Sequence, residues 1–348
     1  MADTKTPAAS LTARFPRASL GHFPTPFETM DRVRTSIACA APLWVKRDDC
    51  SGLAFGGNKV RQLEFYLGDA IVQHATTILI TGAVQSNYVR TAAAAAAKLG
   101  LKCVVQLEDR VQGKDALYKE SGNVLLDHLL GAEIVHYPHG EDEAGADAAL
   151  EALANAARER GEVPYVVHLS EQPRPLGTLG YVVAVEELLA QAASEQVTID
   201  TVILPSGSAA THAGVLVGLH ALGRGDIRVI GACVRRAADQ QSARVLRVAR
   251  AVEGLLECGE LVSSDDVHVD ESALGPGYGG VDAGTRAALA SAAQLEGLIL
   301  DPVYSAKAFA VALSWCAGRE SDAATVFMHT GGTPALFAYG ADLVHHKE

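Results

Sequence analysis

The chain has 348 residues, of which 49% are hydrophobic, 20% are charged and 5% are aromatic, a composition typical of a folded protein. This length predicts two domains or one large α/β unit. The formal net charge of −12, without a cluster of Lys and Arg, argues against a nucleic-acid partner, because phosphate backbones are bound by basic surfaces.

The sequence shows no signal for a membrane or for export. No run of about 18 apolar residues is free of charges, so no spanning helix is predicted. The first 20 residues lack the apolar core of a signal peptide. The six cysteines form neither a CxxC pair nor a Cys/His cluster at zinc spacing, so we expect free, mostly buried thiols and no metal site. These features predict a cytoplasmic protein with no membrane partner.

Short apolar runs rich in Val and Ile, flanked by Gly, Pro or Asp, predict buried parallel strands. They are Leu43–Lys46, Thr77–Thr81, Cys103–Leu107, Glu133–Tyr137, Tyr165–Leu169, Thr201–Pro205, Val229–Val234 and Thr325–His329. Between them, helical spacing of apolar residues predicts helices over Lys59–Ile71, Ser86–Leu99, Asn123–Leu130, Asp142–Arg160, Gly177–Ala193, Thr211–Leu222, Ala238–Gly254, Asp282–Glu296 and Ser305–Cys316. The alternation predicts an α/β fold of doubly wound parallel sheets, with a domain boundary near Tyr165–Gly177.

In such folds, ligands bind where strands end and helices begin, and three turns of this kind carry polar residues. The first turn brings Lys59 to a helix start, behind Gly56 and Gly57. The positive end of the helix dipole favours a neutral amine, which is the nucleophile of Schiff-base chemistry. The same pattern also fits a tight turn followed by a solvated lysine. The spacing does not match a P-loop.

The second turn places Ser86 and Asn87 at the start of a helix, after a strand that ends at Gly82. Ser86 fits a helix N-cap, or Ser86 and Asn87 together fit an anion such as a carboxylate. The third turn follows the strand TVIL and predicts a phosphate-binding loop, because small residues and hydroxyls surround a helix N-terminus. Its residues are Ser206, Gly207, Ser208, Ala209, Ala210 and Thr211. Without a GxGxxG motif, a dinucleotide is disfavoured, and His212 is expected to pack within the helix.

Three later loops add polar groups at comparable positions. Tyr278 lies in the rigid segment GPGYGG, and Tyr304 and Ser305 lie in DPVYS before another helix. Thr330 follows the final strand in HTGGTP. A tyrosine is usually structural, but two in Gly/Pro-rich loops suggest a functional role.

Taken together, the segments KRDDCSGLAFGGNKVRQLEF, GAVQSNYVRTAAAAAAKLGLKC, SGNVLLDHLLGAEI, GPGYGG, DPVYSAKAF and HTGGTPALFAY resemble a known family. It is the pyridoxal-phosphate (PLP) enzyme family of D-cysteine desulfhydrase and 1-aminocyclopropane-1-carboxylate (ACC) deaminase, which includes L-cysteate sulfo-lyase. The resemblance runs from about Phe15 to about Gly340. It implies a tryptophan-synthase-β-like fold (PLP fold type II) with two doubly wound parallel-sheet domains. The large PLP-binding domain would span 1–54 plus 170–348, and a small inserted domain would span 55–169. The resemblance also implies a homodimer.

Carried over to this chain, the resemblance makes Lys59 the residue that forms the covalent imine with the cofactor. Ser86 and Asn87 would meet the substrate carboxylate and the O3′ side of the cofactor. Tyr278 and Tyr304 would face the substrate, and either Tyr278 or Tyr304 would assist proton transfer to or from the leaving group.

The resemblance also assigns the phosphate of PLP to Ser206–Thr211 and places Ser305 where the deaminases carry glutamate. A glutamate beside the pyridine nitrogen would keep it protonated, whereas a neutral hydroxyl, from Ser305 or Thr330, cannot compensate a pyridinium charge. The carbanion would then be less delocalised, which favours prompt β-elimination over opening of a cyclopropane ring.

Three departures from the family pattern concern the site. Gln62 stands where relatives usually have lysine, so one charge on the phosphate side is missing. Tyr88, which borders the expected substrate pocket, stands where relatives often have histidine or glutamine. Arg174 replaces part of a Gly-Gly-Ser segment and fits either a second substrate anion, such as a sulfonate, or a solvated loop.

These observations predict a PLP-dependent lyase that acts on a small β-substituted amino acid. The first expectation is D-cysteine, converted to pyruvate, sulfide and ammonia. L-cysteate, with release of sulfite, comes second, and the ACC deaminase reaction comes third. A binding protein that kept the fold but lost the chemistry would need a missing key residue, and Lys59, Ser86, Asn87 and both tyrosines are present.

Overall fold

Two sheets organise the chain, and both are built from the apolar runs that the sequence marks as strands. The computed structural model describes residues 10–140, 142–168 and 174–343. One sheet has six strands in the order β1-β2-β10-β7-β8-β9, and the other has four in the order β5-β4-β3-β6. All neighbouring strands run parallel except the β1–β2 pair, which is antiparallel. The expected α/β fold with two parallel-sheet units is therefore confirmed. We call each sheet with its helices a lobe.

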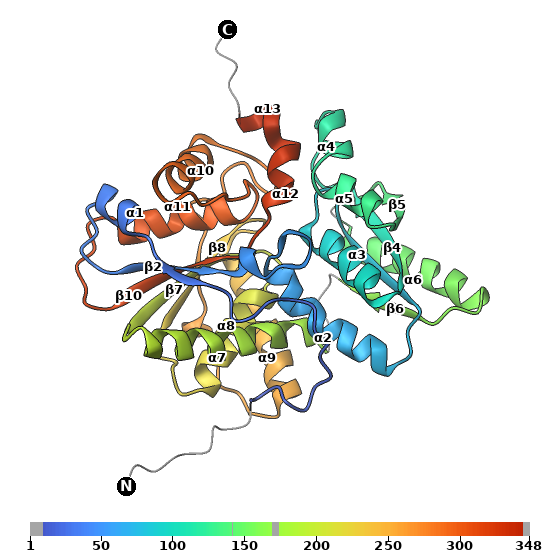
Figure 1. Ribbon diagram of the computed structural model, residues 1–348, viewed down its shortest axis with the longest axis horizontal. Helices are drawn as coiled ribbons and strands as arrows, with labels where there is room; N and C mark the ends of the chain where they lie inside the picture. The colour runs from blue at the N-terminus through green and yellow to red at the C-terminus, as the bar shows by residue number, and fades with distance from the viewer. Residues whose placement is uncertain (1–9, 141, 169–173, 344–348) are drawn as a thin grey trace.

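The large lobe holds the six-stranded sheet (Figure 1). Its strands are β1 (Phe27–Thr29), β2 (Leu43–Arg47), β7 (Ile199–Ser206), β8 (Arg228–Cys233), β9 (His268–Asp270) and β10 (Ala324–His329). Its helices are α1 (Asp31–Ser36), α7 (Leu179–Ser194), α8 (Ala210–Ala221), α9 (Ala238–Leu256), α10 (Ala283–Glu296) and α11 (Ser305–Cys316). Figure 1 shows α1, α10 and α11 on one face of the sheet and α7, α8 and α9 on the other.

The alternation of side chains along β7 explains why both faces are covered. Val202 and Leu204 belong to the core beneath α7, α8 and α9, whereas Ile203 belongs to the core beneath α1, α10 and α11. Because successive residues of a strand point to opposite faces, a continuous apolar run requires helices on both sides.

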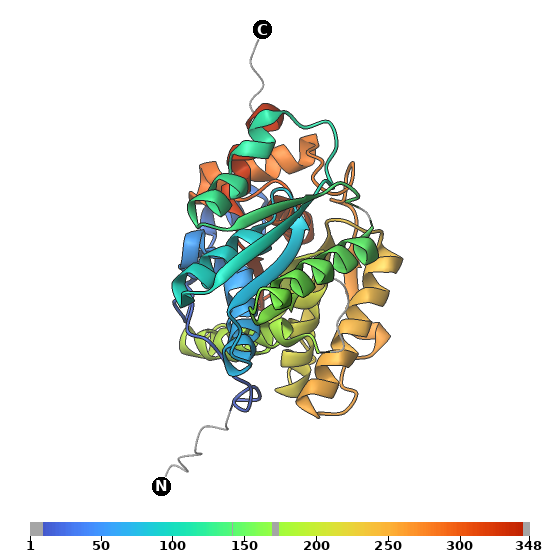
Figure 2. The same cartoon turned by 90° about the vertical axis from the view of Figure 1, so that its right-hand side faces the viewer.

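The small lobe holds the four-stranded sheet, which lies in front in Figure 2. Its elements are β3 (Thr77–Ala83), α3 (Asn87–Leu99), β4 (Lys102–Glu108), α4 (Ala116–Glu120), α5 (Asn123–Leu129), β5 (Glu133–Tyr137), α6 (Glu143–Glu159) and β6 (Pro164–Val167). The alanine-rich helix α3 packs closely on one face, with Ala92–Ala96 buried. Leu150 and Ala154 of α6 cover Leu79 on the other face.

Helix α2 (Asn58–Val72) packs against both lobes. Its residue Phe65 belongs to the core of the large lobe, and Leu63 belongs to the core of the small lobe. The predicted limits of the inserted domain, 55–169, stay a prediction, because this helix is shared and residue 169 lies outside the described residues.

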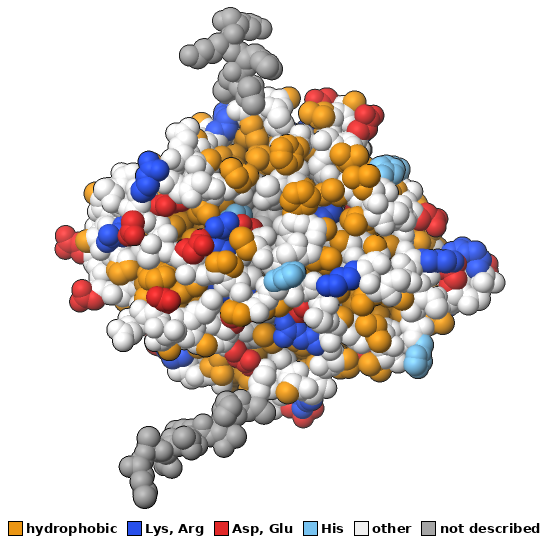
Figure 3. Space-filling model, in the orientation of Figure 1, with side chains coloured by type: hydrophobic (Ala, Val, Ile, Leu, Met, Phe, Trp, Pro, Cys, Tyr) orange, Lys and Arg blue, Asp and Glu red, His pale blue; other side chains and the backbone are white. Residues whose placement is uncertain are grey.

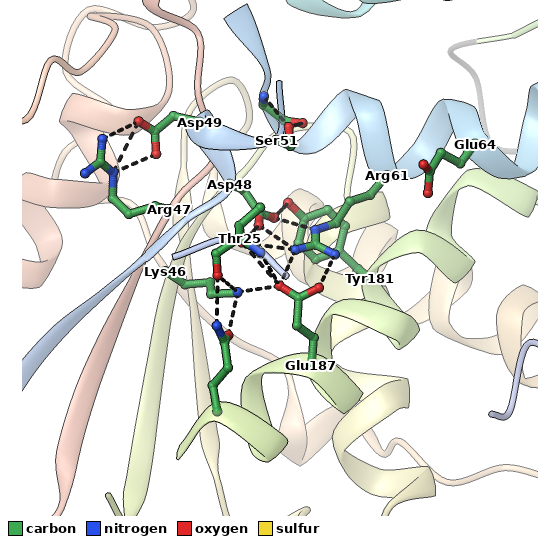
Figure 4. Close-up of polar contacts among 12 residues, drawn as sticks. Thr25, Lys46, Arg47, Asp48, Asp49, Ser51, Arg61, Glu64, Tyr181 and Glu187 are labelled. Atoms are coloured by element: carbon green, nitrogen blue, oxygen red, sulfur yellow. Dashed lines mark hydrogen bonds and ion pairs between the residues drawn. The ribbon is translucent and has the colours of Figure 1, made fainter. Parts of the chain in front are cut away.

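A buried ion network holds α2 against the large lobe (Figure 4). The guanidinium of Arg61 donates to both oxygens of Asp48, at 2.9 and 3.0 Å, and to both oxygens of Glu187 on α7, at 2.8 and 3.0 Å. Lys46 of β2 also binds Glu187, and the hydroxyl of Tyr181 donates to Asp48 at 2.5 Å. Since burial makes each charge depend on its partners, the network holds in place the start of α2, which lies three residues before Arg61.

The remaining elements are short. They are the helices α12 (Thr333–Leu336) and α13 (Gly340–Leu343) and the 3₁₀ turns η1 (Asp48–Cys50), η2 (Leu53–Phe55), η3 (Leu176–Thr178), η4 (Ser264–Asp266) and η5 (Phe337–Tyr339). Every predicted strand has a counterpart, although the predicted end of one, Leu169, lies outside the described residues. The sequence did not reveal β1 and β9, which have three residues each and lie at the sheet edges. Runs this short carry no periodicity.

One segment, Leu176–Ser194, is long and apolar enough to cross a membrane on length and composition alone. In this fold it comprises η3 and α7, and 61% of its apolar window is buried. A core helix that packs on α2 and α8 shows the same composition.

Candidate functional site

A cleft lies where the strand ends of the two lobes meet, and it collects most of the polar turns that the sequence marks. Its volume is about 940 Å³, counting the part open to solvent. It is lined by Asn58, Lys59, Gly82, Ala83, Ser86, Asn87, Tyr88, Arg110, Glu143, Pro205, Gly207, Ser208, Ala209, Thr211, His212, Arg235, Arg236, Arg244, Tyr278, Tyr304, Thr330 and Gly331. Of these, Ser86–Tyr88 and Arg110 follow strands β3 and β4 of the small lobe, and Gly207–Ala209 and Thr211 follow β7 of the large lobe.

Lys59 is the second residue of α2 and reaches the cleft wall. Its Nζ donates to Oε1 of Gln62 at 3.2 Å and lies 4.9 Å from the centre of the Tyr88 ring. Burial lowers the pKa of Lys59 to about 8. The sequence suggested a neutral amine because of the helix dipole, but the structure attributes the lowered pKa to desolvation. In either case a larger fraction of the amine is neutral and nucleophilic near neutral pH than in an exposed lysine.

The start of α3 presents Ser86 and Asn87 to the same cleft. The hydroxyl of Ser86 accepts the backbone N–H of Val89 at 3.3 Å, so Ser86 is also the N-cap of α3. The side-chain amide of Asn123 donates to Oδ1 of Asn87 at 2.9 Å and fixes its orientation. The first amides of a helix have no intrahelical acceptor, which makes this end a suitable place for a carboxylate.

The loop after β7 has the features of a phosphate site. Ala209 is in the left-handed region at φ 74°, and Ala210 begins α8, whose first amides have no intrahelical acceptor. The hydroxyl oxygen of Thr211 accepts the amide of Asn58 at 2.9 Å and the amide of Gln62 at 3.2 Å. Because both lone pairs are engaged, the hydroxyl hydrogen is left to donate to an oxyanion. The residues present therefore fit a phosphate group.

The predicted loop residues divide into two groups. Gly207, Ser208, Ala209 and Thr211 line the cleft, whereas Ser206 and Ala210 are not among its lining residues. Ser206 is buried behind the loop, where its hydroxyl accepts the Gln241 amide at 2.8 Å and lies 3.2 Å from Nδ1 of His212. Burial lowers the pKa of His212 to about 3, so this imidazole is neutral and packs within the fold as expected.

The two loop tyrosines form a pair at the cleft wall. Their hydroxyl oxygens lie 2.6 Å apart, and their rings meet edge to face at 5.9 Å. Burial raises the pKa of Tyr304 well above its ordinary value; burial also raises the pKa of Tyr278, although the nearby Arg110 opposes this shift. The ammonium of Lys307 donates to the carbonyls of Leu274 and Gly277, at 2.7 and 2.8 Å, and holds the loop that carries Tyr278.

Ser305 and Thr330, the two predicted hydroxyls near the cofactor ring, differ in position. Thr330 lines the cleft, and its carbonyl accepts the backbone N–H of Asn58 at 2.9 Å. Ser305 is buried and is not among the lining residues; its hydroxyl donates to Oδ1 of Asp301 at 2.6 Å. Arg174 is exposed and is also not among the lining residues.

The sequence did not single out the charged part of the cleft, which consists of Arg110, Glu143, Arg235, Arg236 and Arg244. Three of the arginines had a usable signal. Arg110 follows β4, and the pair Arg235 and Arg236 follows β8, so all three lie just beyond the carboxyl ends of parallel strands. Glu143 had no such signal, because it begins a surface-like helix, α6, in the other lobe. Among the described residues, no group of three or more His, Cys, Asp or Glu could hold a metal ion.

Comparisons with known proteins agree with this geometry. The family model described as "Pyridoxal-phosphate dependent enzyme" matches residues 18–331. D-cysteine desulfhydrases of Salmonella choleraesuis and Salmonella schwarzengrund are each 39% identical over 328 residues, covering 94% of this chain and 97% of theirs. A crystal structure of an ACC deaminase homologue is 32% identical, with a TM-score of 0.84 over 96% of this chain and 97% of that one. O-ureido-L-serine synthase, at 17% identity and a TM-score of 0.66 over 97% of this chain and 96% of that one, shares the fold alone.

The match to the family model covers most of the chain, and the cleft presents a lysine of lowered pKa beside a loop suited to phosphate. This chain therefore belongs to the pyridoxal-phosphate dependent enzyme family.

Proposed function

We propose that this protein is a PLP-dependent carbon–sulfur lyase that converts D-cysteine to pyruvate, sulfide and ammonia. The observation that carries the proposal is Lys59, with its pKa lowered to about 8, in a cleft between a helix end suited to a carboxylate and a loop suited to a phosphate. The 39% identity to D-cysteine desulfhydrases over 94% of the chain supports the choice of substrate.

In this proposal the cofactor, when bound, accepts the electron pair left at Cα of the substrate. Lys59 holds the cofactor covalently, and Gly207–Thr211 and the start of α8 bind its phosphate. Ser86 and Asn87 bind the substrate carboxylate at the start of α3. The released Nζ of Lys59 would take the Cα proton, because a pKa lowered to about 8 leaves part of the amine neutral near physiological pH.

The tyrosine pair suits control of a proton at the leaving group. Tyr304 and Tyr278 share a short contact of 2.6 Å, and Arg110 favours loss of a proton from Tyr278. We propose that Tyr278 exchanges a proton with the departing sulfur, while the hydroxyl of Tyr304 holds the hydroxyl of Tyr278 in position by a hydrogen bond. Thr330 is the cleft hydroxyl available to the cofactor ring, since Ser305 is bonded to Asp301. Because neither Thr330 nor Ser305 supplies a carboxylate to the cofactor ring, β-elimination is favoured over opening of a cyclopropane ring.

The test is a product assay on the purified protein. D-cysteine should release sulfide and pyruvate together, and L-cysteate and ACC should give little sulfite or 2-oxobutanoate. The Lys59→Ala variant should lose the visible absorption of bound cofactor and at least about 10³-fold of turnover. Lys119→Ala, at an exposed lysine, is the matched control and should behave as wild type. If the enzyme releases sulfite from L-cysteate, or 2-oxobutanoate from ACC, with a higher kcat/KM than it shows for D-cysteine, the proposed substrate is wrong.

We also propose that the enzyme is a cytoplasmic homodimer. Figure 3 shows apolar side chains gathered over the upper part of one face, where α4, α12 and α13 lie in Figure 1. On this side, Leu117 of α4 and Phe337 of η5 are exposed, and their elements are in contact. Light scattering after gel filtration should give twice the chain mass of 36.4 kDa, whereas a single chain mass would refute the dimer.

A further inference from the structure

Three arginines of the large lobe converge on one carboxylate of the small lobe at the edge of the cleft. Oε1 of Glu143, on α6, accepts from Arg235 and from Arg236, each at 2.7 Å. Its Oε2 lies 3.5 Å from the guanidinium of Arg244 on α9. Burial opposes the charge of Glu143, but the three arginines outweigh this and lower the pKa of the carboxyl. The cluster is therefore ionised and joins the two lobes.

Two of these arginines also contact the loop that suits phosphate. Nη1 of Arg236 donates to the carbonyl of Gly207 at 3.1 Å, and Nε of Arg244 donates to the carbonyl of Ser208 at 3.4 Å. Gln62 approaches the same loop through Thr211 but is neutral. Arg236 and Arg244 thus bring positive charge to the Gly207–Thr211 loop.

Arg236 is partly buried beside the two other arginines of the cluster. Burial and the neighbouring Arg244 and Arg235 lower its pKa to about 10, in spite of Glu143. Its guanidinium carries five N–H donors, of which the bonds to Gly207 and Glu143 use two. A phosphate monoester brings a charge of about −1.5 to −2 and strong acceptor oxygens, and arginine binds such groups better than any neutral residue.

We propose that Arg236 binds the phosphate of the cofactor and supplies the charge that neutral Gln62 does not bring to this loop. The inference rests on the proposed phosphate-binding loop of the enzyme, but it does not depend on which amino acid is the substrate. It also makes Arg236 a link between cofactor and lobes, because the same guanidinium holds Glu143 of α6.

The experiment compares PLP with pyridoxal, which lacks the phosphate. The full-length protein is freed of cofactor with hydroxylamine and titrated with each compound, and binding is followed by the visible absorption of the lysine-bound form. Arg236→Gln should weaken PLP binding about tenfold or more, because one charge-assisted contact is lost. It should leave the affinity for pyridoxal within about twofold of wild type.

Two further variants separate charge from structure. Arg236→Lys keeps the charge and should retain most of the affinity for PLP. Adding Gln62→Lys to Arg236→Gln places an ammonium beside Thr211 from the other side and should restore PLP affinity at least in part. Arg228→Gln, at the exposed opposite end of β8, is the control and should bind both compounds as wild type.

Two results would overturn the proposal. If Arg236→Gln binds PLP as wild type does, Arg236 does not contact the phosphate. If it weakens PLP and pyridoxal equally and Arg236→Lys does the same, Arg236 serves only the shape of the loop. Neither result concerns turnover of D-cysteine, so failure of this inference and failure of the proposed substrate are distinguishable.

Discussion

At the scale of single residues, the reactivity of Lys59 comes from its surroundings. The amine lies between Gln62 and the face of Tyr88, a setting that solvates an ammonium poorly. Burial lowers the pKa of Lys59 from 10.5 to about 8. The neutral, reactive amine therefore already predominates above pH 8, whereas an ordinary lysine reaches this point only above pH 10.5. A lysine on the surface would be almost fully protonated under the same conditions.

We expect the rate at which the cofactor-free enzyme captures PLP to follow this titration. The rate should rise about tenfold per pH unit below pH 8 and level off above it, measured by stopped-flow absorbance. The Lys59→Ala variant gives the background from surface lysines. A rate that continues to rise up to pH 10 would show that the amine is not desolvated in solution.

At the scale of elements, helix α5 contains a buried acid that has no hydrogen-bond partner among the described residues. Both carboxylate oxygens of Asp127 lack a hydrogen-bond partner among the described residues, and its side chain is fully buried. Burial raises the pKa of Asp127 to about 8, although Arg90 opposes the shift. The folded state therefore binds a proton that the unfolded state releases above about pH 4, so this group lowers stability as pH rises from 4 to 8.

Asp127→Asn should accordingly stabilise the protein, and the gain should depend on pH. The difference in Tm between variant and wild type should be small near pH 4, increase up to pH 8 and then stay constant. Scanning calorimetry or thermal circular dichroism across this range would measure it. Asp322→Asn, at an exposed acid, is the control. A lower Tm for Asp127→Asn than for wild type at pH 8 would mean that Asp127 is ionised and favourably paired with Arg90.

At the scale of the whole molecule, the two lobes are joined by α2 and by the Glu143 cluster. The bonds from Arg236 and Arg235 to Glu143 connect residues 93 and 92 positions apart in the chain. Removing the carboxylate leaves three guanidiniums without their shared partner, a larger loss than that of an ordinary surface pair.

Glu143→Ala should therefore lower the free energy of unfolding by about 1–2 kcal/mol. This is less than for a fully buried ion pair, because the side chain of Glu143 is 22% exposed and solvent screens its charge. Urea unfolding at low and high salt would measure the change, which should shrink as salt screens the charges. Glu159→Ala, at the exposed end of the same helix, should show no comparable loss. An unchanged midpoint for Glu143→Ala would mean that the cluster does not hold the lobes together.

The amino-acid sequence by itself determined the alternation of strands and helices and the polar turns at the strand ends. Lys59, Ser86, Gly207 and Thr211 could be found because parallel strands place their carboxyl ends at one edge, where ligands bind. Tertiary structure alone decided that Ser305 is buried and bonds to Asp301, whereas Thr330 lines the cleft. It also decided that Glu143 meets the arginines, because contact between residues so distant in the chain depends on how the two lobes pack. Local patterns describe the neighbours of a residue along the chain, whereas burial and charge pairing arise only when the sheets come together.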